Sequence, residues 1–516
     1  MTADSTLKEP PAKPSLFIYL SIILGALAIS LDFASIDLAL PALEKEFGLN
    51  LESVQWVING YVIAFAVLMV AGGKFADAYG RKRLFLIGMT IFGIASLLGG
   101  CAWSGGSVIA FRVLQGVGAA ILWPAMIGMA CGALGENKQA LALAIIFGTC
   151  SIGNAAGPVV GGALTEYFSW RWVLWINVPM TAAAMLMTWF KVPWDQTDDI
   201  KPKNDYLGIV LLVTGLVAMM IVVYQYDDWG WTDTRTIVCS VVALTFLVAF
   251  PFHENHTAHP LVPPNVLRSP EILTLGFCVL ILCQLFFVVL LYVTQYAMKF
   301  LGEGPADAGT RVIVFMLAYG AVSFFCQQLY QRFGKRRLLI FGLICGAIAA
   351  VSLGIIGPGA EGLSYNLAAV ILGIAVGAVL PTANVAAIDY VGTAQAGMIS
   401  GIMFMIQLAG AAAMLAVSTA VFASVSHSHL NDAFHKENVT LTAAQDADAR
   451  SIIRGAKTIH QIPPSLTTDI ADVIPIIRDA YNAGLRAVFF LSAILVSVAL
   501  IFTLIFVKHP KAPPPA

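Results

Sequence analysis

The chain has 516 residues, of which 59% are hydrophobic and 11% are charged, and its formal net charge at pH 7 is −1. So few charged residues cannot cover the surface of a soluble protein of this length, which excludes the soluble globular class. The composition indicates an integral membrane protein.

Apolar runs long enough to cross a membrane follow one another along the whole chain. About 20 apolar residues cross a hydrocarbon core of roughly 30 Å, and each such run is expected to be a helix because lipid offers the backbone no hydrogen-bond partner. The first run is too long for a signal-peptide core and is interpreted as an uncleaved helix. Fourteen candidate spans result, at 15–40, 54–73, 84–102, 107–130, 139–165, 171–192, 206–226, 235–252, 272–297, 310–330, 337–357, 364–388, 396–425 and 485–507.

The orientation follows from the basic residues. Lys and Arg concentrate in alternate loops, and short basic loops stay in the cytoplasm. With an even number of spans, both termini are predicted to be cytoplasmic. The expected location is the bacterial cytoplasmic (inner) membrane, with several passes through the lipid bilayer.

An internal repeat divides the chain. YGRKRL (79–84) after the second span recurs as FGKRRL (333–338) after the tenth. Two six-span halves in parallel orientation fit this spacing only if spans 7 and 8 lie between them. A duplicated bundle is typical of a transporter whose substrate binds between the halves. We expect an N-terminal six-helix bundle at 1–192, a linker with two extra transmembrane helices at 193–262, and a C-terminal six-helix bundle at 263–516 that includes a long periplasmic loop at 426–484.

Five stretches in chain order carry a family resemblance. GKFADAYGRKRL (73–84) is similar to a loop signature after span 2, RVLQGVGAA (112–120) to a span 4 motif, and GNAAGPVVGG (153–162) to an antiporter motif of span 5. LDFASIDLALP (31–41) and WRWVLWINVP (170–179) resemble signatures of a fourteen-span branch. Nearly the whole chain therefore resembles the fourteen-span drug:proton antiporter branch of the major facilitator superfamily. The resemblance implies an all-α membrane protein with two six-helix bundles plus two inserted helices.

Three positions depart from the family pattern. Ala78 stands where the loop usually has a basic residue, and Asp37 stands where the branch usually has asparagine. The second loop has Gln331 in place of Asp77, which weakens the expectation of a symmetric gate.

Three charged residues lie deep within predicted spans, where charge is costly, namely Asp32, Asp37 and Arg112. At 1.5 Å per residue, Asp32 and Asp37 lie roughly 13 and 6 Å inside Pro41, and Arg112 lies about 8 Å inside Ser107. Arg112 therefore lies at a depth between the two carboxylates. We expect it to pair with one of them, so that breaking the pair changes that group's proton affinity. Asp32 is the better carrier because Asp37 is nearer to water; the alternative is a static ion pair.

Span 5 has a glycine at every fourth residue, at positions 153, 157 and 161, which removes side chains from one helical face. A neighbouring helix can then approach closely, and Pro158 permits a bend. Simple tight packing explains the pattern equally well. The family resemblance favours a gating interface made by Gly153, Gly157, Pro158 and Gly161, with Gly397, Gly401 and Gly410 serving the second half similarly.

The loop after span 2 combines basic residues with Asp77. Asp77 and Arg81 can pair at i,i+4, and Gly80 allows a tight turn. The topological role of the basic residues explains them fully, but it explains neither Asp77 nor Gly73. In the family, this aspartate contributes to an inter-helix contact that biases the conformation, so the resemblance implies a gating role for Asp77, together with Gly73, Gly80 and Arg81.

Polar residues within spans are candidates for the substrate cavity or for bonds between helices. They are Asn59, Gln115, Asn154, Gln284, Asn384 and Gln407. HENHTAH (253–259) lacks the metalloprotease spacing and is interpreted as a solvated loop, so no metal site is expected. No catalytic residue is assigned.

The expected function is proton-coupled export of amphiphilic or cationic small molecules or drugs. Nothing resembles a nucleotide-binding loop, so no cofactor is expected and the proton gradient is the energy source. The expected partners are a small-molecule substrate and protons, with no nucleic acid; a monomer and an accessory export partner are both compatible with the sequence. A dedicated transporter of one metabolite or siderophore is the close alternative. A membrane-embedded enzyme or receptor is a remote one, since it needs more convergent polar residues within the spans.

Overall fold

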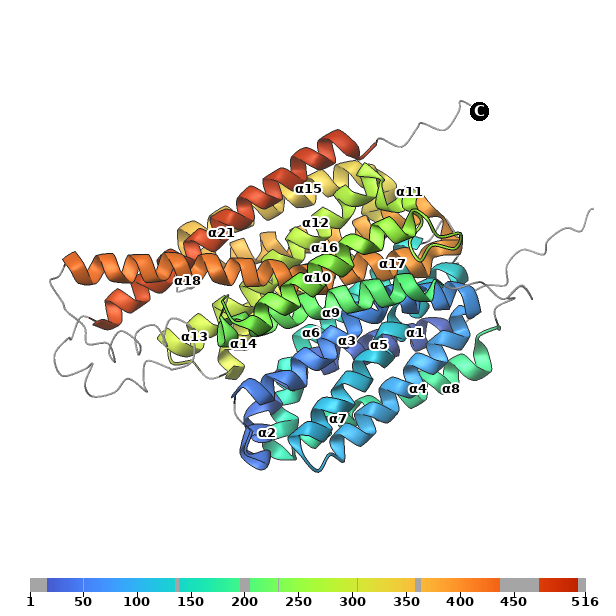
Figure 1. The fold of residues 1–516 in the computed structure, drawn as a ribbon, viewed down its shortest axis with the longest axis horizontal. Coiled ribbons are helices and arrows are strands. Elements are labelled where there is room, and N and C mark those ends of the chain that lie inside the picture. The colour runs from blue at the N-terminus through green and yellow to red at the C-terminus, as the bar shows by residue number, and fades with distance from the viewer. Residues whose placement is uncertain are drawn as a thin grey trace, which may run out of the picture.

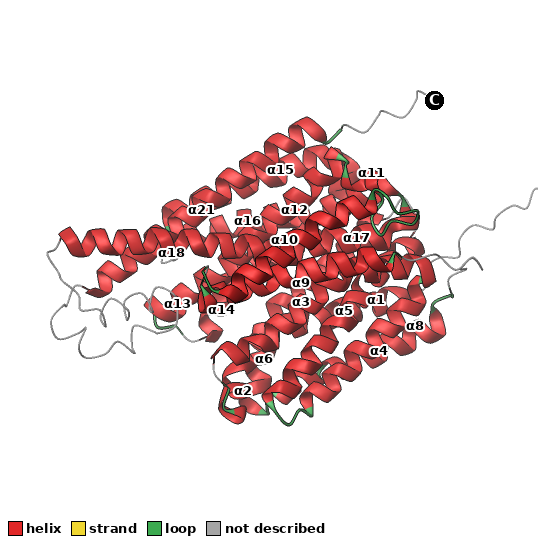
Figure 2. Ribbon diagram, viewed as in Figure 1, coloured by secondary structure: helices red, strands yellow, loops and turns green. Residues whose placement is uncertain are grey.

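The computed structural model describes residues 16–49, 51–134, 139–194, 205–230, 232–303, 305–357, 363–436 and 473–508. Within these ranges the chain is helical and contains no strand (Figure 2). The expected all-α fold is confirmed.

Helices α1 to α8 form the first group. The first span combines α1 (Leu16–Ser35), the 3-10 turn η1 (Ile36–Ala39) and α2 (Leu40–Phe47). The following elements are α3 (Leu51–Tyr79), α4 (Arg81–Gly100), α5 (Gly105–Leu134), α6 (Gln139–Tyr167), α7 (Arg171–Trp175) and α8 (Asn177–Lys191). Within this group, α3 and α4 pack on α5, and α1 packs on α6 and α8.

The second group runs from α12 to α21. Its elements are α12 (Pro270–Val288), the π-helical segment η3 (Val289–Val293), α13 (Thr294–Phe300), α14 (Pro305–Phe324), α15 (Cys326–Ile356), α16 (Leu363–Val391), η4 (Thr393–Gln395), α17 (Ala396–Met405), the π-helical segment η5 (Ile406–Gly410), α18 (Ala411–Lys436) and α21 (Val473–Phe506). Here α15 packs on α16 and α21, and α12 packs on α16, α18 and α21.

Two further helices, α9 (Tyr206–Trp229) and α10 (Thr234–Glu254), pack on each other and precede the short α11 (Pro264–Leu267). In Figure 1 this green pair crosses the front of the molecule between the blue first group and the orange and red second group. α9 contacts α3 from the first group and α18 from the second. The two groups also meet directly, where α17 packs on α3 and α5 and where α14 packs on α6.

Thirteen helices in the described residues are long and apolar enough to cross a membrane, so the expected count of fourteen is not reproduced. The difference lies in the span expected at 310–330. A break at Phe325 ends α14 (Pro305–Phe324) there, and of this helix only Arg311–Phe324 counts as an apolar segment among the described residues. The part that follows is joined to the next span as α15, although Gly334 is non-helical within it.

The outer segment expected at 426–484 is helical at both of its ends. α18 continues to Lys436 and α21 already begins at Val473; residues 437–472 lie outside the described residues. Hydropathy missed these extensions because they are held by a narrow apolar stripe. Phe422 packs against Tyr481 with ring centroids 4.8 Å apart, and Gly484 lies directly over the Phe422 carbonyl.

The repeated loops share one backbone feature. Gly80 has φ 99° and ψ 130°, and Gly334 has φ 75° and ψ 161°, conformations that only glycine adopts readily. Each glycine ends one helix and starts the next without a connecting loop. The internal repeat in the sequence is therefore also a repeat of local geometry.

We expect Gly334→Ala to lower the free energy of unfolding by about 1 to 3 kcal/mol, because an L side chain is strained at this backbone conformation. Gly106→Ala is the matched control, since a Cβ at Gly106 meets nothing within 4 Å. Denaturant unfolding of both variants in detergent measures the difference. Equal stability of the two variants would contradict the expectation.

Candidate functional site: a buried ion pair beside a central cavity

Asp32 on α1 and Arg112 on α5 form an ion pair inside the first helix group. Arg112 Nη1 donates to Asp32 Oδ2 over 2.6 Å, and the two side chains are 1% and 0% exposed. Removing both charges from water is costly unless further hydrogen bonds satisfy them. Arg112 gains two of these, from Nε to the Val57 carbonyl and from Nη1 to Gln115 Oε1.

Uncharged amide groups donate hydrogen bonds to the other oxygen of the Asp32 carboxylate. Gln115 Nε2 donates to Oδ1 over 3.0 Å and Asn177 Nδ2 donates to the same oxygen over 2.7 Å. Both amides also donate to Ser96 Oγ, which in turn donates to the Leu174 carbonyl. Gln115, expected as a cavity residue, is therefore a partner of the ion pair. Asn177 was missed, although it lies in the 170–179 stretch that carries the family resemblance.

The cation also faces an aromatic ring. The Arg112 guanidinium lies over the Tyr61 ring, 4.2 Å from its centroid, an arrangement that favours positive charge. Arg112 Nη2 and Tyr61 Oη are buried and have no hydrogen-bond partner in the described residues. The network therefore leaves one donor, Arg112 Nη2, without an acceptor among the described residues. A buried polar group without a hydrogen bond lowers the stability of the fold.

Asp37 lies in different surroundings. It is on η1, its side chain is exposed, and it makes no side-chain hydrogen bond within the described residues. It lines a cavity of about 380 Å³ whose walls come from both helix groups, including Phe286 and Leu290 on α12. Arg112 thus pairs with the buried carboxylate of Asp32, and Asp37, which faces the cavity, has no ion-pair partner in the described residues.

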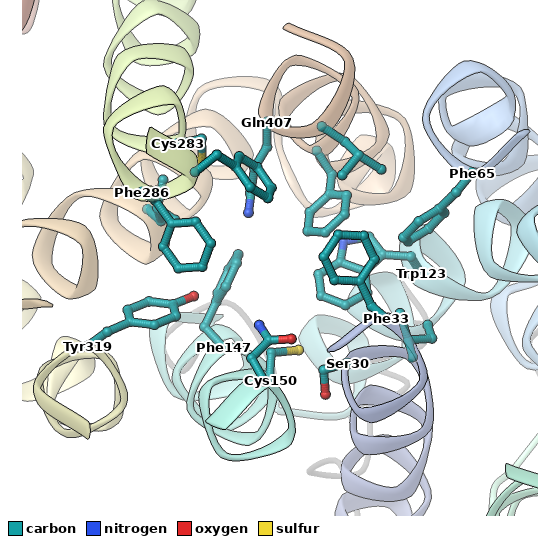
Figure 3. A pocket seen from close by; sticks show the side chains of 16 residues that line it. Ser30, Phe33, Phe65, Trp123, Phe147, Cys150, Cys283, Phe286, Tyr319 and Gln407 are labelled. Atoms are coloured by element: carbon teal, nitrogen blue, oxygen red, sulfur yellow. The ribbon is translucent and has the colours of Figure 1, made fainter. Parts of the chain in front are cut away.

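A smaller cavity of about 90 Å³ lies between the two helix groups (Figure 3). Its walls are mostly aromatic, and Figure 3 shows Phe33, Phe65, Trp123 and Phe147 facing Phe286 and Tyr319 across the space. Trp123 and Phe404 close one side with ring centroids 4.1 Å apart. The polar groups in the lining are on Ser30, Cys150, Asn154, Cys283, Tyr319 and Gln407, with Trp123 adding an indole N–H.

The structure separates the six amides expected to line a substrate cavity. Asn154 and Gln407 line the central cavity, and each has a buried side-chain oxygen without a partner in the described residues. Asn59 lines a further cavity near α9. The remaining amides, Gln115, Gln284 and Asn384, lie away from these cavities. Gln284 donates to Ser418 and Ser492, and Asn384 donates to the Leu380 carbonyl.

The glycines of span 5 pack α6 against α1. A Cβ at Gly153, Gly157 or Gly161 would lie 2.5 Å or less from Ser30 Oγ, Ala34 Cβ or the Ser35 carbonyl, respectively. Ser35 Oγ donates to the Gly157 carbonyl over 3.0 Å. This face therefore holds the segment of α1 that carries Asp32. Pro158 lies within α6, between two of these glycines.

Asp77 joins the two helix groups at the end that carries the repeated loops. Its carboxylate accepts from the backbone N–H groups of Gly397 and Met398 over 3.1 and 2.8 Å, at the start of α17. A helix N-terminus favours a negative group. Arg81 Nη2 also donates to Asp77, over 3.2 Å, and Arg81 Nη1 donates to the Gly128 carbonyl.

The backbones also approach closely at this contact. A Cβ at Gly73 would lie 2.3 Å from the Gly397 carbonyl, and one at Gly401 would lie 2.6 Å from the Met69 carbonyl. Gly397 and Gly401 were expected to serve the second half as the glycines of span 5 serve the first. Both glycines pack against α3 of the first group, so the close approach that they allow lies between the two halves.

The second copy of the loop makes different contacts. Tyr330 donates to Asp389 over 2.6 Å, Lys335 pairs with Glu271 over 2.5 Å, and Arg336 donates to the Leu504 carbonyl. All these partners lie on α16, α12 and α21. With Gln331 in place of the aspartate, the second loop has no counterpart of the Asp77 contact among the described residues.

We expect Arg112→Leu to lower the free energy of unfolding by about 3 to 5 kcal/mol, because it leaves a buried carboxylate without its cation. The double variant Asp32→Leu/Arg112→Leu removes both charges and should be more stable than Arg112→Leu alone. Denaturant titration in detergent gives both values. A double variant that is less stable than Arg112→Leu would show that the charges are not the reason for the loss.

Comparisons with known proteins agree with this architecture. The sequence profile of the Major Facilitator Superfamily matches residues 22–415. The puromycin resistance protein pur8 of Streptomyces alboniger is 32% identical over 80% of this chain and 83% of its own. The cephamycin export protein CmcT of Amycolatopsis lactamdurans is also 32% identical, over 78% of this chain and 85% of its own. The tetracenomycin C resistance and export protein of Streptomyces glaucescens is 26% identical over 96% and 91%.

Solved structures show the same fold. The human organic anion transporter MFSD10 superposes with a TM-score of 0.60 over 96% of this chain and 99% of its own, at 11% identity. The proton:xylose symporter XylE superposes with a TM-score of 0.59 over 95% of both chains, at 13% identity. Profile, relatives and fold agree: the chain is a member of the Major Facilitator Superfamily.

Proposed function

We propose that this protein is a proton-coupled exporter of amphiphilic or cationic small molecules. The observation that carries the proposal is the pair of unlike carboxylates on the first span. Asp32 is sealed and paired with Arg112, whereas Asp37 faces a cavity between the helix groups without a partner. Intramembrane carboxylates typically mark ion and substrate pathways.

The Asp32 network supports a role in proton coupling. A neighbouring cation favours the charged carboxylate, and burial without that cation favours the neutral form. Protonation of Asp32 would remove its attraction to Arg112 and release α1 from α5. Because α1 also contributes Ser30 and Phe33 to the central cavity, a shift of this helix would change the substrate site. Loss of the proton would restore the pair.

The cavity lining supports an amphiphilic substrate. Aromatic side chains dominate the central cavity, and of the described side chains that line it or the cavity beside it, Asp37 alone is acidic or basic. A lipophilic cation matches both properties. A dedicated transporter of one metabolite or siderophore remains the second candidate, because the names of three relatives each refer to one antibiotic: puromycin, cephamycin or tetracenomycin C.

The Asp77 contact supports a gating role and an outward-facing state. The basic residues predict that the loop end is cytoplasmic, and at that end α17 lies closed against α3. The Asp37 cavity lies nearer to the opposite end. We therefore propose that bundles 1–192 and 263–516 rock about the central cavity, with both termini in the cytoplasm and the protein acting as a monomer.

Proton release tests the proposed function. In liposomes containing the purified protein, lipophilic cations should release protons with wild type and not with Asp32→Asn, because the amide cannot carry the proton. Asp37→Asn should lose the response to cations and keep the response to neutral drugs. Asp233→Asn, which alters a carboxylate that caps α10 away from the cavities, is the matched control.

The panel also contains siderophores, so that the second candidate is tested in the same assay. A response to one compound only would indicate a dedicated transporter. Unchanged proton release in Asp32→Asn would refute the assignment of Asp32 and point to Asp37.

Gating by Asp77 can be tested separately. Asp77→Ala removes the acceptor of two backbone N–H groups. Loss of one charge-assisted hydrogen bond, worth about 1.5 kcal/mol, would lower the ratio of closed to open molecules about tenfold. Met398 is 1% exposed, and Met398→Cys keeps the backbone donor. Alkylation of this cysteine should be about tenfold faster with Asp77→Ala. The control is Asp233→Ala, which removes a carboxylate that caps α10 and bonds within the same segment. It should leave the alkylation rate unchanged.

A further inference from the structure

The helix inserted between the two halves forms part of a cavity wall. This third cavity has a volume of about 460 Å³ and lies where α9 contacts α3 and α18. Both helix groups contribute to its lining, and α9 adds Val223 and Tyr224. We call this space the vestibule. It shares Phe33 and Phe287 with the central cavity and with the cavity of Asp37, so the three spaces adjoin.

The sequence of α9 explains why Tyr224 faces inward. Leu212, Leu216 and Met220 recur every fourth residue and are 6%, 5% and 0% exposed. Residues four apart lie on one face of a helix, and this face packs against the bundle. Tyr224 is the next member of the stripe. At its level the stripe meets the vestibule instead of a packed helix.

The vestibule is lined by uncharged hydrogen-bonding groups. On α3, Asn59 is only 9% exposed and makes no side-chain hydrogen bond within the described residues; neither does Gln55 or Tyr224. On the opposite wall, Tyr292 Oη donates to Thr419 Oγ1 over 2.8 Å. A nearly buried amide without a partner is costly unless water or a ligand satisfies it.

We propose that the vestibule is a subsite for the uncharged, hydrogen-bonding part of an amphiphilic substrate, such as a hydroxyl-rich or amide-bearing group, and that Tyr224 determines specificity there. This inference deepens the proposed export function and rests on it. It assigns the inserted helix a direct part in substrate recognition.

The chemistry of the lining selects this class of group. Amide and hydroxyl side chains can both donate and accept, so they match a group that does the same. Among the side chains that the structure describes, none of those lining the vestibule is acidic or basic, in contrast to the neighbouring cavity that contains Asp37. The volume lies within the usual range for small-molecule sites. An apolar cation would therefore occupy the aromatic cavity and the Asp37 cavity, and its polar substituent would extend into the vestibule.

A matched pair of ligands tests the subsite. One probe is an alkyltriphenylphosphonium cation, and the other carries a glucosyl group at the end of the same alkyl chain. Tyr224→Phe removes only the hydroxyl group. It should weaken equilibrium binding of the glucosyl probe to the purified full-length protein by about three- to tenfold, the effect of one neutral hydrogen bond. Binding of the alkyl probe should not change.

Tyr206→Phe is the control, because Tyr206 is on the same helix and is 66% exposed. It should change neither affinity. Equal affinities of wild type and Tyr224→Phe for the glucosyl probe would overturn the proposal, and so would an equal loss for both probes.

Cysteine labelling separates this proposal from the proposed function. In a Cys101→Ser background, which removes the exposed native cysteine, Tyr224→Cys should react with a hydrophilic, membrane-impermeant maleimide, and Val222→Cys, on the other face of α9, should not. The glucosyl probe should slow the reaction of Tyr224→Cys. If wild type binds neither probe, the proposed export of such cations fails; reactivity of Tyr224→Cys still supports the vestibule, and an unreactive Tyr224→Cys overturns it.

Discussion

The charge of Asp32 inside an apolar bundle is the constraint on which the first helix group depends. Its carboxylate takes donors from α5 and α8, and Arg112 reaches the Val57 carbonyl on α3. Ser96 connects the amides to α4. A change in the charge state of one side chain is therefore felt by five helices. Since buried charges without partners are unstable, the helices cannot separate at this level while the pair is intact.

Close backbone approach has two different purposes in this fold. The glycines of α6 bring it against α1 inside the first group, so they fix the position of Asp32 and of the central cavity wall. Gly73, Gly397 and Gly401 bring α3 against α17 across the two groups. The first contact would be kept if the two groups moved as bodies, whereas the second would have to break if they separated at the loop end. Spacing alone does not distinguish them.

Much of the architecture could be predicted because hydropathy and charge act along the chain. Long apolar runs predicted the helices, and the scarcity of charge within them singled out Asp32 and Arg112. Orientation around each helix was harder to predict, because a transmembrane helix is apolar on all sides and no polar face marks its inner surface. Gln284 and Asn384 were therefore grouped with Gln407, although only Gln407 reaches the cavity. The ends of α18 and α21 were left out of the predicted spans because their buried apolar residues form a narrow stripe and no continuous apolar run.

The unlike contacts of the two repeated loops have a consequence for the energetics of the cycle. A second contact of the Asp77 type would add to the free energy required to open this end of the protein, because its hydrogen bonds would also have to break. Only the first loop has this contact among the described residues, and the partners of the second loop lie within their own half. The first loop therefore joins the two halves, whereas the second joins helices of one half. A substitution in the second loop would then act on the packing of its own half, and one at Asp77 on the contact between the halves.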